Sequence, residues 1–175
     1  MRKGRGPSRA VVAVTGTGLV IAYAVLAVVQ ILVLNPLAAA PGRDLAQIQR
    51  DLEAAGQSLM PAFAIGVPAF GVVLAILLAV LGRLLHASGR DLTLGYLLLL
   101  AAGTPAYFVA SFGAGMSLAD TYMIDGGDHS PWARPLHAAS TAAIVLLVIV
   151  GVVETIRAAR RSRAGDHTPG TPSPR

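Results

Sequence analysis

Long uncharged stretches alternate with short charged segments along this chain. Four stretches lack Asp, Glu, Lys and Arg: 33 residues between Arg9 and Arg43, 29 between Glu53 and Arg83, 28 between Asp91 and Asp120, and 19 between Arg134 and Glu154. An α-helix rises about 1.5 Å per residue, so roughly 20 apolar residues cross a hydrocarbon core about 30 Å thick. The pattern therefore predicts four membrane-spanning helices, at about residues 10–34, 61–81, 93–116 and 136–156.

Prolines mark where these helices should end or bend. Asn35-Pro36 should end the first span, because proline cannot continue a helix. Pro68 lies inside the second span, and Gly103-Thr104-Pro105 lies inside the third. We expect a kink at Pro68 and another at Pro105, since a proline inside a helix removes one backbone hydrogen bond.

The segment between the first two spans has a different pattern. Apolar residues recur there at 3-4-3 spacing between charged ones, at Leu45, Ile48, Leu52 and Ala55, and Gly56 follows. This spacing predicts a short amphipathic helix that lies on the membrane surface or covers the bundle. The predicted fold is an all-α integral membrane protein, an antiparallel four-helix transmembrane bundle with a short extracytoplasmic amphipathic helix.

The positive charges predict the orientation of the bundle. The two tails and the turn between the second and third spans carry 11 Arg and Lys residues, and the two remaining loops carry 3. This bias predicts that both termini are cytoplasmic. Residues 1–9 would then form a basic cytoplasmic tail, residues 10–156 the transmembrane domain, and residues 157–175 a second tail that is basic and then disordered beyond about Arg163.

Two features of the sequence concern the origin and processing of the chain. One Lys stands against thirteen Arg, which we interpret as a GC-rich bacterial genome, so the predicted location is a bacterial cytoplasmic membrane. The basic start, the apolar stretch and Ala38-Ala39-Ala40 also resemble a signal peptide with a cleavage site. The apolar stretch is too long for that interpretation, which we do not favour.

Composition and charge exclude several classes of function. The chain has no cysteine, which removes disulfide frameworks and thiol chemistry. Its sequence pI of about 10.4 does not indicate nucleic-acid binding, because the basic residues lie at helix ends, where the bilayer explains them. No charged residue falls near the centre of a span. This argues against proton-coupled export of the kind used by small four-helix multidrug exporters, which need an acid in the first span.

The loop before the fourth span carries residue types that can ligate metals. They are Asp120, Asp125, Asp128 and His129, with His137 just inside the span. Their spacing matches neither a calcium loop nor HExxH. We therefore predict a solvated turn, with no metal, no cofactor and no catalytic residue. A membrane enzyme that uses this loop is the third and least favoured hypothesis.

A row of small residues on the third span suggests close helix packing. Ala102, Ala106, Ala110 and Ala114 recur every four residues on one face. Small residues let helices approach closely in lipid, where packing drives association. The row packs either within the bundle of the same chain or against another membrane protein. A partner role, as accessory subunit or homo-oligomer, is the leading functional hypothesis: a non-enzymatic multi-pass protein that acts through helix packing.

Polar residues inside the spans support an alternative. Thr15, Thr17, Tyr23, Gln30 and Thr104 would line a small channel or carrier for a neutral or lipophilic solute. The simpler interpretation is that these side chains hold helices together.

Interfacial positions also lead to expectations. We expect Tyr96, Tyr122 and Trp132 to be interfacial anchors, and Glu154 to pair with Arg157 one helical turn later.

Overall fold

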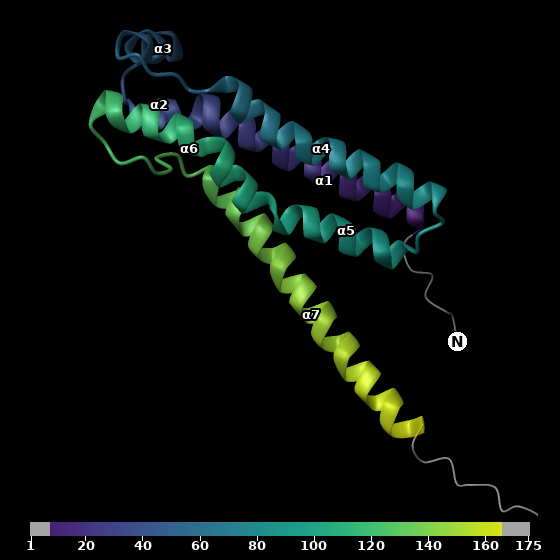
Figure 1. The fold of residues 1–175 in the computed structure, drawn as a ribbon. Helices are drawn as coiled ribbons and strands as arrows, with labels where there is room; N and C mark the ends of the chain where they lie inside the picture. The colour runs from purple at the N-terminus through teal and green to yellow at the C-terminus, as the bar shows by residue number, and fades with distance from the viewer. Residues whose placement is uncertain (1–7, 166–175) are drawn as a thin grey trace, which may run out of the picture.

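The computed structural model describes residues 8–165, in which all regular structure is helical (Figure 1). The elements are α1 (Arg9–Val29), the π-helical turn η1 (Gln30–Leu34), α2 (Asn35–Ala39), α3 (Leu45–Ala54), α4 (Pro61–Leu84), α5 (Gly89–Ala101), α6 (Gly103–Tyr122) and α7 (Ala133–Gly165). Four helical segments are long and apolar enough to cross a membrane: Arg9–Ala39, Pro61–Leu84, Gly89–Tyr122 and Ala133–Arg157. The prediction of an all-helical chain with four such helices is confirmed.

The first long helix does not end at Asn35-Pro36, so that prediction is wrong. Helical structure continues through α1, η1 and α2 to Ala39. Proline lacks an N–H group, and its ring clashes with the carbonyl group four residues earlier. The π-helical turn, in which the N–H of Asn35 bonds to the carbonyl of Gln30, widens the helix just before Pro36. A single extra residue in the turn therefore accommodates the proline without ending the helix.

The third long helix is interrupted at Ala102, directly before the expected kink at Gly103-Thr104-Pro105. By contrast, α4 passes through Pro68 without interruption. The last helix begins three residues earlier than predicted and continues to Gly165. Residues 1–7 and 166–175 lie outside the described part of the chain, and with them most of the basic first tail and of the tail that we expected to be disordered.

The short amphipathic helix predicted between the first two spans is present as α3. A capping box closes its start: the Asp44 side chain accepts from the backbone of Gln47, and the Gln47 side chain accepts from the backbone of Asp44. Two residues on the inner face of α3, Ile48 and Leu52, are fully buried. Gly56, which follows the helix, has a φ of +70°, a left-handed conformation that glycine adopts at low cost.

Helix α1 lies between α4 and α5, and α4 also contacts α6. The fourth long helix, α7, packs mainly on α5 and leans away from α1 and α4 toward its C-terminal end (Figure 1). We call the end that carries α3 and residues 123–132 the loop end, and the opposite end, where α1 starts, the terminal end. Three buried clusters form the core, at the loop end, in the middle and near the terminal end.

Tyr96 is buried between helices, so the expectation that it is an interfacial anchor is wrong. Its ring packs directly on Gly16 of α1. Its hydroxyl group shares a hydrogen bond of 2.9 Å with Thr17 and donates to the carbonyl of Ala75. Tyr96 therefore joins α1, α4 and α5 near the terminal end.

Candidate functional site

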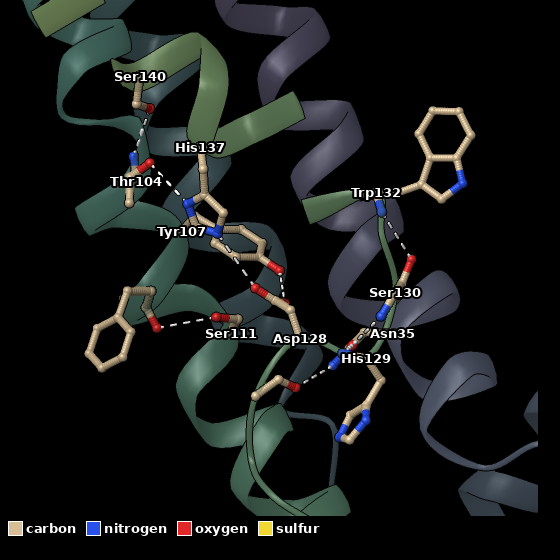
Figure 2. Close-up of polar contacts among 12 residues, drawn as sticks. Asn35, Thr104, Tyr107, Ser111, Asp128, His129, Ser130, Trp132, His137 and Ser140 are labelled. Carbon is tan, nitrogen blue, oxygen red and sulfur yellow. Dashed lines mark hydrogen bonds and ion pairs between the residues drawn. The ribbon is translucent and has the colours of Figure 1, made fainter. Parts of the chain in front are cut away.

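The loop between α6 and α7 is held against the bundle by one buried amide side chain. Oδ1 of Asn35 accepts hydrogen bonds from the backbone N–H groups of His129, at 2.7 Å, and Ser130, at 3.3 Å. Its Nδ2 donates to the carbonyl of Gly127 at 3.5 Å. Asn35, which directly precedes Pro36 in the first long helix, thus holds the loop against that helix (Figure 2).

This anchoring places Asp128 among polar side chains of α6 and α7. The Tyr107 hydroxyl group donates to Oδ1 of Asp128, and Nε2 of His137 lies 3.6 Å from Oδ2 (Figure 2). The rings of Tyr107 and His137 meet edge to face, with centroids 5.6 Å apart. The Asp128 side chain keeps 29% of its surface exposed. The expectation that the loop is only a solvated turn therefore fails at Asp128, which is tied to the helices.

A chain of polar contacts continues from His137 into the bundle. Nδ1 of His137 and Oγ1 of Thr104 are 3.3 Å apart. Oγ of Ser140 accepts from the backbone N–H of Thr104 at 3.0 Å and donates to the Tyr23 hydroxyl group at 3.4 Å. The interruption at Ala102 frees that N–H group, because the first N–H groups of a helix lack an intrahelical acceptor.

Gln30 completes the cluster and differs from the rest. It belongs to the π-helical turn, and its residue surface is 0% exposed. Its amide lies close to the Tyr107 hydroxyl group but does not meet it with hydrogen-bond geometry. Within residues 8–165, neither Nε2 nor Oε1 of Gln30 has a partner. π-helical turns are frequent at functional sites, and a buried amide without partners is costly.

We call this group the loop-end polar cluster. Its members come from the first, third and fourth long helices and from the loop: Tyr23, Gln30, Thr104, Tyr107, Asp128, His137 and Ser140. It offers hydrogen-bond donors and acceptors and a single carboxylate. Across residues 8–165 there is no group of three or more His, Cys, Asp or Glu side chains arranged to hold a metal ion.

The structure brings together three of the five residues predicted to line a solute path. Tyr23, Gln30 and Thr104 belong to the loop-end polar cluster. Thr15 is exposed on the outside of α1, and Thr17 is bound to Tyr96. The five residues therefore do not line one path: three lie together, and the other two lie elsewhere on α1.

The alanine row on the third span is divided as well. Ala110 and Ala114 are buried in the core of the chain itself. Ala106 is half-buried, and Ala102 is exposed. Half of the row thus packs internally, which is the simpler of the two interpretations of this pattern.

The remaining loop residues do not converge with Asp128. Asp120 and Asp125 are exposed, and Nε2 of His129 lies 3.0 Å from the carbonyl oxygen of Asp125. Sequence reasoning missed Asn35, Tyr107 and Ser140, although each is a polar residue within an apolar segment, which is itself a signal of function. The pairing expected for Glu154 is confirmed, since Arg157 lies 3.1 Å away.

Comparison of the chain with protein-family models, with curated proteins and with solved structures found no match.

Proposed function

We propose that this chain is a multi-pass membrane protein that binds a small neutral polar solute at the loop-end polar cluster, as a small channel or carrier. The observation that carries this proposal is the buried and unpartnered amide of Gln30. Leaving a buried donor or acceptor unsatisfied costs about 1–3 kcal/mol for each group. A guest that donates and accepts hydrogen bonds, such as an amide, a urea or an alcohol, offsets this cost.

The surroundings of Tyr23 support the proposal because they contain space. A cavity of about 60 Å³ lies beside Tyr23, where Pro68 of α4 and Gly103 of α6 line it. One water molecule needs roughly 10–15 Å³ by the same measure. The cavity therefore has room for more than one water molecule beside Tyr23; its lining is almost entirely apolar and does not include Gln30.

The proposal includes an orientation in the membrane. The four long helices would form an antiparallel bundle in a bacterial cytoplasmic membrane, with both termini in the cytoplasm. The distribution of Arg and Lys supports this orientation. Helix α3 and the loop-end polar cluster would then face the outside, so the solute would enter from the extracytoplasmic side.

Thermal unfolding of the purified protein tests the binding. Fluorescence of Trp132, the one tryptophan of the chain, reports unfolding in detergent while urea, acetamide or glycerol is added at millimolar concentrations. A ligand that binds only the folded state raises the midpoint as its concentration rises. We expect one of these compounds to raise the midpoint of the wild type but not of Gln30→Leu.

Uptake into proteoliposomes tests the transport role with the same compounds. We expect faster entry of the stabilising compound with the wild type than with Gln30→Leu, and an unchanged rate with Gln49→Leu, a substitution on the exposed face of α3. Equal shifts of the midpoint in the wild type and in Gln30→Leu on addition of every compound, together with equal uptake, would show that Gln30 does not bind solute and has only a structural role.

A second candidate function is helix packing against another membrane protein, as accessory subunit or homo-oligomer. The observation in its favour is on α4, where Ala62, Gly66 and Ala69 are exposed on the bundle surface. A Cβ atom at Gly66 would meet no other atom of the described residues within 4 Å. Native mass spectrometry tests this role. We expect Gly66→Leu to disrupt an oligomer or a co-purifying complex and Gly18→Leu, at an exposed glycine of α1, to leave it intact; a monomer in the wild type would contradict it.

A further inference from the structure

A groove between α5 and α7 extends from Tyr23 toward the terminal end. Its first part, about 400 Å³, lies between α1, α5 and α7 and is almost entirely apolar. Its second part, about 390 Å³, lies between α5 and α7. Leu97 lines both parts, so they follow one another along α5. The leaning of α7 away from α1 in Figure 1 accounts for the open space.

One face of α7 borders the groove along its whole length. Five of the lining residues on this helix recur at alternating steps of three and four: Ala139, Ala142, Leu146, Ile149 and Val153. Residues at this spacing form a single stripe on a helix. The groove is therefore one continuous surface, which an extended apolar chain would follow.

Two arginines stand at the terminal end of this groove. Glu154 lies 3.2 Å from Arg90 of α5 and 3.1 Å from Arg157 of α7. The carboxylate thus draws the two guanidinium groups toward each other across the groove. Two positive groups face one negative group, so the end of the groove keeps a net positive charge. Asp91 keeps its negative charge, but its carboxylate caps the start of α5 through Ser88 and does not line the groove.

We propose that this groove binds one anionic phospholipid. An acyl chain would lie along α5 and α7, and the phosphate would lie at Arg90 and Arg157. Each guanidinium group has five N–H donors in a fork that suits phosphate oxygens, and Glu154 occupies only part of them. Basic pockets between membrane helices are known to bind anionic head groups. The head-group end of the groove, at Arg90 and Arg157, lies at the opposite end of the bundle from the loop-end polar cluster, so the arginine variants test it separately from the solute-binding proposal.

Native mass spectrometry of the full chain in mild detergent tests this binding. Phosphatidylglycerol and phosphatidylcholine with identical acyl chains serve as the probes. We expect the wild type to retain phosphatidylglycerol in preference, and each of Arg90→Gln and Arg157→Gln to weaken that retention roughly fivefold, since an interfacial arginine contributes about this much to binding anionic lipid. Arg83→Gln, at the terminal end of α4 and outside the groove, is the matched control and should change nothing.

A second pair of variants tests the apolar part. Leu97→Trp fills the groove where its two parts meet, whereas Leu98→Trp places the same ring on the adjacent, 64% exposed position. We expect only Leu97→Trp to reduce retention of phosphatidylglycerol. The proposal is overturned if both lipids are retained equally, if Arg83→Gln acts as strongly as the groove variants, or if a second protein chain occupies the groove in place of lipid.

Discussion

The hydroxyl group of Tyr107, on α6, donates a hydrogen bond to the carboxylate of Asp128 in the loop before α7. This contact, 21 residues apart in sequence, draws an acidic loop residue onto the helices. His137 approaches the same carboxylate from α7 at 3.6 Å. The three side chains together connect the third long helix, the loop and the fourth long helix at the loop end.

Asp128→Asn should therefore destabilise the fold. A hydrogen bond to a charged group contributes about 1.5–3 kcal/mol, and an amide accepts from Tyr107 more weakly than a carboxylate does. We expect a lower unfolding midpoint in detergent by a corresponding amount. Asp125→Asn, at an acid whose side chain is 83% exposed in the same loop, should change the free energy of unfolding by less than about 0.5 kcal/mol. Equal effects of the two substitutions would mean that the contact with Tyr107 contributes nothing.

Gln30→Leu should stabilise the protein when no solute is present. The substitution keeps the approximate volume and removes two buried groups without partners, each of which costs about 1–3 kcal/mol. We expect a higher unfolding midpoint in the absence of added solute, measured by Trp132 fluorescence. A lower midpoint would show that Gln30 is already satisfied in the purified protein, for example by an ordered water.

Two glycines of the same helix should respond in opposite directions to one substitution. A Cβ atom at Gly16 would clash with the ring of Tyr96, whereas one at Gly18 would meet no other atom of the described residues within 4 Å. Gly16→Ala should destabilise by roughly 1–3 kcal/mol, because the packed ring must move. Gly18→Ala should be neutral or stabilise by up to about 1 kcal/mol, because alanine favours a helix more than glycine does. Unfolding measurements on the two variants check this, and a tolerated Gly16→Ala would mean that Tyr96 moves freely.

Asn35→Ala should loosen the loop at His129 and Ser130. The substitution leaves the N–H groups of His129 and Ser130 without their acceptor. We expect faster hydrogen exchange of those two amides, with little change in the middle of α4. Leu37→Ala, at an exposed position two residues later, is the control and should leave the exchange unchanged. Slow exchange in Asn35→Ala would show that other contacts hold the loop.

The sequence by itself determined that the chain has four long apolar helices and a short amphipathic one. Charges are costly in a hydrocarbon core, so the gaps between them, from Arg9 to Arg43 and onward, indicate which helices are long and apolar enough to cross a membrane. Gly56 likewise marks the end of α3 through its left-handed backbone. These signals are local: each depends on a residue and its near neighbours along the chain.

Only the tertiary structure decided which polar residues meet. Thr17 pairs with Tyr96 across 79 positions, and Asn35 reaches His129 across 94, distances over which no local pattern carries information. Pro36 is an instructive case, because its local signal predicts a helix end, yet a π-helical turn lets the helix continue to Ala39. The loop-end polar cluster depends on that turn and on how four helices pack, and packing follows from the shapes of side chains on different segments rather than from the order of any one of them.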